Sequence, residues 1–133
     1  MKTFHIIAAS LLLAVPAFAH AHLKSSTPAS GATVKAPAQV TLTFTEPVNA
    51  GSSTFKVYPQ PKGTLNLAQL LNAKNDQAKR VDKGISPTQG GVSTVTIDLQ
   101  AGLKPGTYVV MWKVLAEDDG HVTQDDLIFT VKR

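Results

Sequence analysis

The chain has 133 residues, with 13 Lys and Arg against 9 Asp and Glu and no cysteine. The absence of cysteine excludes disulfide bonds, thiolate zinc sites and cysteine-ligated blue-copper centres, so any bound metal must use nitrogen and oxygen ligands. The lysines are scattered singly and aromatic residues make up only 6% of the chain, which argues against nucleic-acid binding, where cations cluster and aromatic rings stack on bases.

The first 19 residues have the pattern of a secretory signal peptide. Lys2 gives a positive start, Ile6 to Val15 form an apolar run, and Ala17-Phe18-Ala19 is a small-x-small cleavage site. A membrane-spanning helix is the alternative, but this run is shorter than the roughly 20 apolar residues that a bilayer requires. We therefore expect an exported protein that has no membrane span once the signal is removed.

Cleavage after Ala19 would leave residues 20–133, a length that suits one domain with a single hydrophobic core. The mature chain then has 12 Lys and Arg against 9 Asp and Glu, a net charge of +3. We expect it to be a monomer.

Beyond the signal, apolar residues recur mainly at a period of two, which predicts β-strands. Turn signals separate the candidate strands at Ser30-Gly31, Pro47, Gly90-Gly91 and Pro105-Gly106. The spacing favours two antiparallel sheets packed as an immunoglobulin-like sandwich, although a closed barrel would give a similar pattern. The predicted strands, rich in Val, Ile, Thr, Phe and Tyr, are Val40–Phe44, Thr54–Tyr58, Val92–Leu99, Thr107–Leu115 and Leu127–Val131.

Two segments are less regular. Thr64–Arg80 places leucines among Asn, Gln and Lys and could form a short helix or a mobile loop, whereas Lys83–Gly91 is predicted to be an exposed connection. Trp112 lies in the most apolar strand, where a tryptophan that fills the core is favoured over one that stacks on a ligand.

Cleavage after Ala19 would make His20 the first residue and give a metal both an α-amine and an imidazole from one residue. An α-amine has a pKa of about 7.7–8.0 and loses its proton to a metal at modest cost near neutral pH, and imidazole suits copper, nickel and zinc. In an extended segment, His22 would project on the same side as His20.

A second candidate cluster, Glu117-Asp118-Asp119-Gly120-His121, lies between the last two predicted strands. Asp119 and His121 could both turn towards one ion, because Gly120 permits a tight bend. Together with His20 they make the nitrogen- and oxygen-rich set that copper(II) prefers. The acidic run by itself could instead be a solvated turn, and His22 could be an ordinary surface or packed histidine.

The order of motifs resembles the CopC family of periplasmic copper-resistance proteins. The resemblance spans the mature chain, is weakest from Pro59 to Gly91, and rests on His20-Ala-His22-Leu-Lys-Ser-Ser-Thr-Pro28, Leu42-Thr-Phe44-Thr-Glu46-Pro47-Val, Pro105-Gly106-Thr-Tyr108, Trp112-Lys-Val and Asp119-Gly120-His121. It implies an all-β immunoglobulin-like Greek-key sandwich of about seven strands, located in the periplasm.

For function, the resemblance implies one copper(II) ion held by His20, Asp119 and His121, and transfer to an inner-membrane copper transporter. It also implies a glutamate near the metal, here Glu46, for which an exposed strand-end carboxylate is the alternative. Two features depart from the family. The mature chain has no methionine cluster for copper(I), only Met111 in a predicted strand, and Asp118 competes with Asp119 for the ligand role. We choose Asp119 for its Asp-x-His spacing.

Three alternatives stay open. An N-terminal histidine with a second imidazole also resembles the copper brace of oxidative polysaccharide monooxygenases, and the sandwich alone would allow a metal-free adhesion or assembly module. His20-Ala21-His22 could also wrap copper(II) with its backbone amides, at the expense of strand hydrogen bonds. We expect a binding protein, not an enzyme. We also expect His22 to lie near the metal, as an optional ligand or as a hydrogen-bond partner of a ligand.

Overall fold

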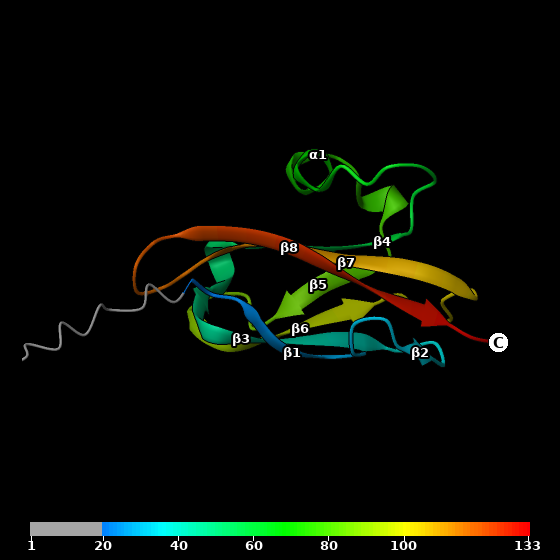
Figure 1. Cartoon of the computed structure of the whole chain (residues 1–133), viewed down its shortest axis with the longest axis horizontal. Helices are drawn as coiled ribbons and strands as arrows, with labels where there is room; N and C mark the ends of the chain where they lie inside the picture. Colours follow the sequence, from blue (N-terminus) through cyan, green and yellow to red (C-terminus); the bar gives the residue numbers. More distant parts are fainter. Residues whose placement is uncertain (1–19) are drawn as a thin grey trace, which may run out of the picture.

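The computed structural model describes residues 20–133, which form two four-stranded β-sheets packed face to face with one short α-helix outside them (Figure 1). The sheet orders are β1-β3-β6-β5 and β2-β8-β7-β4. The expected signal segment, residues 1–19, lies outside the described residues, and within the described residues no helix is long and apolar enough to span a membrane. The strands are β1 Leu23–Thr27, β2 Thr33–Val34, β3 Gln39–Asn49, β4 Thr54–Pro59, β5 Asp82–Ser86, β6 Gly91–Leu99, β7 Gly106–Leu115 and β8 Val122–Val131, with α-helix α1 at Leu67–Asn72 and 3-10 helices η1 at Ala50–Ser52 and η2 at Gln77–Lys79.

The immunoglobulin-like sandwich is confirmed, with eight strands where about seven were expected. The additional strand is β2, whose two residues pair in parallel with the end of β8, while every other pair is antiparallel. Near the start of β7 the Tyr108 hydroxyl donates to the Lys104 carbonyl at 2.6 Å, the tyrosine-corner bond that marks immunoglobulin-like domains. The strands divide into two sheets that are linked by one isolated bridge, Val48 with Ala116, so the closed barrel is excluded for residues 20–133.

The core lies between the sheets and comes from the alternation seen in the sequence. In β3, Val40, Leu42 and Phe44 are buried, whereas the residues between them are partly exposed. Trp112 is 2% exposed and packs edge-on against Phe44 with ring centroids 6.1 Å apart, which confirms its predicted place in the core. Each such side chain contributes about 1.5–3 kcal/mol through burial, and this packing holds a domain that has no disulfide.

Three predicted boundaries were wrong. Of the expected exposed connection Lys83–Gly91, residues 87–90 do connect two strands, but residues 83–86 belong to strand β5, which pairs with β6 although Ile85 is its only half-buried apolar side chain. Strand β3 continues through Pro47, where a turn was expected, because its register with β6 shifts between Thr43 and Val48 and such an irregularity accommodates proline. Strand β8 begins at Val122, five residues before the predicted start, in a polar stretch that carries little alternation.

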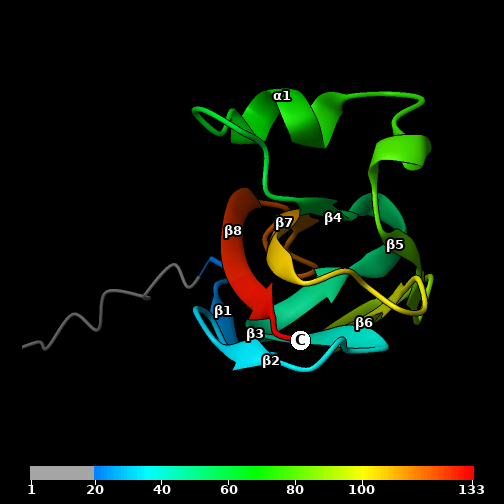
Figure 2. The same cartoon turned by 90° about the vertical axis from the view of Figure 1, so that its right-hand side faces the viewer.

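Helix α1 packs on the outer face of the second sheet and covers Met111, which is fully buried (Figure 2). Beneath the helix the Lys56 ammonium, on a residue only 4% exposed, donates at 2.8 Å to each of three acceptors: Leu70 O, Ala73 O and an Asp76 carboxylate oxygen. Burial alone would raise the pKa of Asp76, but hydrogen bonds from Lys56, Tyr58 and Arg80 outweigh it and hold that pKa below its usual range. Of the two predicted states of this segment, the short helix is the one found.

Candidate metal centre

The loop between β7 and β8 is a tight turn closed by its own backbone. The Ala116 N–H donates to the His121 carbonyl at 2.8 Å, and the Gly120 N–H donates to the Ala116 carbonyl at 3.1 Å. Gly120 has a φ of 70°, a conformation that costs glycine nothing and strains other residues. The Glu117 N–H bonds to the Pro47 carbonyl at 2.9 Å, which fixes the loop to β3. This turn brings the residues on either side of Gly120 together.

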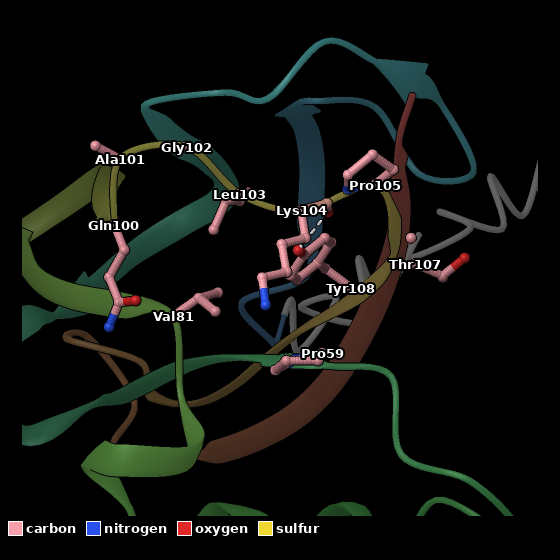
Figure 3. Close-up of a pocket in the computed structure, with 11 residues that line it drawn as sticks. Pro59, Val81, Gln100, Ala101, Gly102, Leu103, Lys104, Pro105, Thr107 and Tyr108 are labelled. Atoms are coloured by element: carbon pink, nitrogen blue, oxygen red, sulfur yellow. Dashed lines mark hydrogen bonds between the residues drawn. The ribbon is translucent and has the colours of Figure 1, made fainter. Parts of the chain in front are cut away.

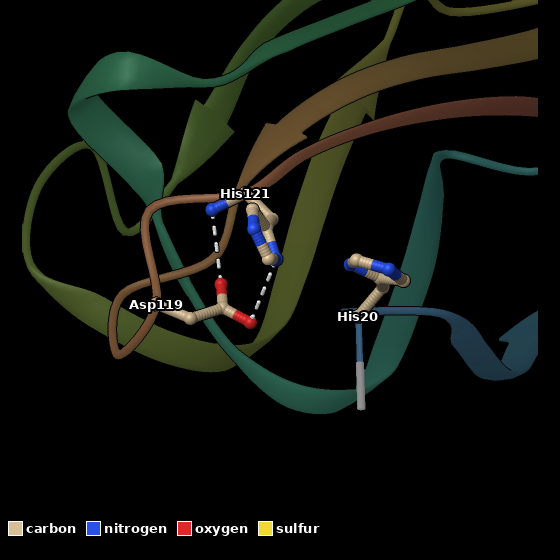
Figure 4. A group of neighbouring side chains, drawn as sticks. All are labelled: His20, Asp119 and His121. Carbon is tan, nitrogen blue, oxygen red and sulfur yellow. Dashed lines mark hydrogen bonds and ion pairs between the residues drawn. The ribbon is translucent and has the colours of Figure 1, made fainter. Parts of the chain in front are cut away.

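Asp119 and His121 are paired within the loop (Figure 4). Asp119 Oδ1 accepts the His121 backbone N–H at 2.9 Å, and Asp119 Oδ2 lies 3.2 Å from His121 Nδ1. That backbone hydrogen bond is the main reason why the pKa of Asp119 is lowered, and the nearby His121 and His20 rings act in the same direction. Asp119 is therefore held as a carboxylate, the form that binds metals.

His20 approaches this pair from the other sheet because residues 20–22 are held between the two sheets. Thr45 on β3 donates its N–H to the His22 carbonyl at 2.8 Å, and its hydroxyl accepts the His22 N–H at 3.1 Å. Thr123 on β8 donates its hydroxyl to the Ala21 carbonyl at 2.9 Å, and Ala21 itself is 1% exposed. The His20 ring consequently stands 4.8 Å from the His121 ring, measured between centroids.

His20, Asp119 and His121 each offer a ligand atom, and these atoms all lie within 4.8 Å of one another. Nitrogen and oxygen ligands lie about 2.0–2.2 Å from zinc, and bonds of that length put neighbouring ligands about 3 Å apart and opposite ligands just over 4 Å apart. The 3.2 Å between Asp119 and His121 already matches a neighbouring pair, and a shift of under about 1 Å would bring in His20.

The site lies at the surface. The His121 side chain is 49% exposed and that of Asp119 is 29% exposed, so an ion could enter and leave without opening the core. A carboxylate with two imidazoles suits copper(II), and within residues 20–133 no other group of three His, Asp or Glu side chains is as close.

The other candidates lie outside this group. His22 is exposed, and its ring stands 6.1 Å from the His20 ring in an edge-on arrangement. Glu46, half-buried on β3, and Asp118, exposed in the loop, do not place a carboxylate oxygen among the three ligand atoms. Sequence reasoning missed Thr45 and Thr123, because a threonine in a strand carries no sign that it will hold a distant segment.

A cavity of about 360 Å³ lies at the opposite end of the sandwich, where β4 ends and β7 begins (Figure 3). It is lined by apolar groups such as Val81 and Leu103 and by Lys104, with neither histidine nor carboxylate. Its lining offers no metal-ligating set, so the candidate centre is the His20, Asp119 and His121 group.

Most of the described chain matches a known protein family and similar bacterial proteins. The CopC domain family matches residues 23–132. Protein YobA of Escherichia coli K12 is 36% identical over 116 residues, covering 86% of this chain and 81% of that protein. Copper resistance protein C of Xanthomonas campestris pv. juglandis is 31% identical over 133 residues, covering 99% and 95%.

Two solved structures are similar in fold as well as in sequence. PcoC, described as a methionine-rich copper resistance protein from Escherichia coli, aligns with a TM-score of 0.64 and 27% identity, covering 86% of this chain and all of that one. CopC from Methylosinus trichosporium OB3b aligns with a TM-score of 0.60 and 26% identity, covering 85% and 94%. The family match begins after His20, which is a candidate ligand because of its position in this structure and the residue pattern around it.

Proposed function

The chain belongs to the CopC family, and from that premise we propose that it is a periplasmic copper(II)-binding protein that sequesters copper or delivers it to an inner-membrane copper transporter. The observation that carries the proposal is the meeting of His20 with Asp119 and His121, about 100 residues later in the chain, within 4.8 Å at one end of the sandwich. Its activity is binding and release, not turnover.

The ligand set follows from the geometry and from the expected processing. Cleavage after Ala19 adds the His20 α-amine to its own imidazole, so one residue supplies two nitrogens in a chelate. Asp119 adds a charged oxygen and His121 a third nitrogen, which completes four nitrogen and oxygen donors of the tetragonal kind that copper(II) favours. His22, whose ring stands 6.1 Å from the His20 ring, is proposed as an additional ligand or as a hydrogen-bond partner of one, and Glu46 keeps the same proposed role on the family resemblance.

The same donors disfavour copper(I), which prefers sulfur. The chain has no cysteine, and the one methionine of the mature chain, Met111, is fully buried beneath α1 on the outer face of the second sheet. One copper(II) ion per chain is therefore the expected cargo.

A competition experiment with mature protein tests this proposal. Protein that begins at His20 should retain one equivalent of copper(II) against a moderate chelator, and its electron paramagnetic resonance spectrum should show couplings to imidazole nitrogen. His121→Ala should weaken retention and remove one set of couplings, while His22→Ala, the matched control, should cost less because that ring lies outside the ligand group. A silent His121→Ala with a severe His22→Ala would place the metal on the terminal His-Ala-His wrap instead.

A further inference from the structure

Strand β8 has an unpaired edge beside the candidate metal centre. On one side β8 pairs with β7 along its whole length, but on the other side β2 meets it only at Thr130 and Val131, so the described strands leave the edge open from Val122 to Asp126. Figure 2 shows β8 along one side of the molecule. An open edge presents backbone N–H and C=O groups on which another strand can pair.

The direction of these groups follows from the bonds at the paired end. The Ile128 carbonyl accepts from Gly31 N–H at 2.7 Å and the Thr130 N–H donates to the Ala32 carbonyl at 2.8 Å, so even-numbered residues of β8 face away from β7. The β7–β8 register has no shift, and the alternation therefore directs the backbone groups of Val122 and Gln124 outward. The Asp126 N–H bonds instead to the Asp125 carboxylate at 2.8 Å.

The side chains along this strand include exposed hydrophobic residues. Of the described residues, the two large hydrophobic side chains that are exposed are Val122, at 55%, and Ile128, at 39%, and both lie on the same side of β8. Asp125, on the other side of β8, lines a concave surface together with Gln124 and His22. The edge thus combines outward backbone groups and exposed apolar side chains with a position next to His121, a proposed ligand.

The segment that carries this edge is acidic, whereas the mature chain as a whole is basic, and Lys113 on β7 is the basic residue paired across from Gln124. Although the mature chain carries a net charge of +3, no Lys or Arg occurs between Lys113 and Lys132, and five of the nine acidic residues lie there: Glu117, Asp118, Asp119, Asp125 and Asp126. Burial, and after it the neighbouring Asp125 charge, raises the pKa of Asp126. A cation beside this pair would relieve the repulsion between the two carboxylates.

We propose that the Val122–Asp126 edge of β8 is the docking site for an extended, basic segment of the protein that exchanges copper with this chain, which adds to the sheet as a further strand. The inference rests on the proposed function, because only a copper carrier needs a partner at this position. Strand addition takes its affinity from main-chain hydrogen bonds, and complementary charge speeds encounter and excludes wrong partners. A segment paired here would end beside His121 and so reach the exposed ion.

A second copy of this chain is a poorer occupant of the same edge. Two β8 edges paired with each other would bring the Asp125 and Asp126 carboxylates of both copies together, and like charges on neighbouring strands are destabilising. The same carboxylates suit lysine or arginine side chains on an incoming strand.

The test uses mature protein, isotope-labelled for NMR, with an acetylated and amidated octapeptide that alternates lysine with valine. The comparison peptide has glutamate in place of lysine. We expect the lysine peptide to shift the amides of residues 122–126 and to slow hydrogen exchange at Val122 and Gln124, with an affinity that falls as salt rises. The glutamate peptide should do neither.

Variants make the assignment specific. Asp125→Lys with Asp126→Lys should weaken peptide binding about tenfold or more, whereas Asp98→Lys, an exposed aspartate on β6, should leave it unchanged. Gln124→Pro removes an N–H that faces away from β7 and should abolish the exchange protection without breaking the β7–β8 ladder.

Four outcomes would each overturn the proposal. They are amide shifts that map outside residues 122–126, equal binding of both peptides, no binding of the lysine peptide, and a concentration-dependent dimer through β8. Copper(II) affinity should stay unchanged in Asp98→Lys and Gln124→Pro, because neither alters a proposed ligand or a charge beside the candidate centre. If the wild-type protein docks the lysine peptide but binds no copper(II), the proposed function fails and the docking edge stands. If it binds copper(II) but not the peptide, only the docking proposal fails.

Discussion

Replacing Lys56 by methionine should destabilise the domain strongly, because the buried ammonium joins α1 to the second sheet. It makes three hydrogen bonds of 2.8 Å, to Asp76 and to the carbonyls of Leu70 and Ala73. Methionine keeps most of the side-chain volume but leaves the Ala73 carbonyl without a partner, leaves the Leu70 carbonyl with only the Ala73 N–H at 3.4 Å, and removes one of the partners of Asp76.

These contacts indicate how much free energy of unfolding the Lys56→Met variant should lose. Breaking a buried ion pair by removing one partner costs about 3–5 kcal/mol. Asp76 keeps hydrogen bonds from Tyr58 and Arg80, so we expect the lower end, about 3 kcal/mol. For a domain of this size that corresponds to a fall in Tm of roughly 10–20 °C.

Urea unfolding measures this cost directly, as a lower midpoint at an unchanged slope. Lys83→Met, at an exposed position on β5, is the matched control and should change the free energy of unfolding by less than about 0.5 kcal/mol. A loss below about 1 kcal/mol in Lys56→Met would refute the reasoning, since that is what an exposed ion pair contributes.

Three further predictions concern the metal and pH. Asp119→Asn should weaken copper(II) binding by more than about tenfold in a chelator competition, because it removes the charged oxygen ligand; unchanged affinity would move the oxygen ligand elsewhere, with Asp118 the first candidate. Reduction to copper(I) should greatly lower affinity, and tight retention against a copper(I) chelator would contradict the nitrogen and oxygen set. The folded pKa of Asp76 lies below its usual 3.8, so its contribution to stability is present above that pH and is lost as pH falls below it. Acid unfolding curves should therefore show a shallower loss in Asp76→Asn, and parallel curves would exclude the cluster as a source of acid sensitivity.

The strands that the sequence predicted are those buried on one face. Val40, Leu42 and Phe44 alternate with polar residues because one side of β3 packs in the core and the other does not. Strand β5 has no such pattern, because it lies at the edge of its sheet and includes Gly84. Its position depends on pairing with β6, which local sequence does not encode.

The sequence predicted which residues form the candidate site but not how they are arranged in space. Its ligand types could be chosen from chemistry and family resemblance, and Gly120 marked the bend between Asp119 and His121. The bonds that hold residues 20–22 in place come from Thr45 and Thr123, the latter more than 100 residues along the chain. Contacts of such sequence separation depend on how the two sheets pack and so follow from the fold.

The most direct test of the account compares mature protein that begins at His20 with the same protein carrying one additional glycine before it. The extension converts the His20 α-amine into an amide, which binds copper(II) only if it gives up its own proton, and leaves the His20, Asp119 and His121 side chains in place. Copper(II) affinity should fall by more than the roughly 10–100-fold that the loss of a ligand's outer hydrogen-bond partner costs. Equal affinity of the two proteins would contradict the central claim that the processed N-terminus is part of the metal centre.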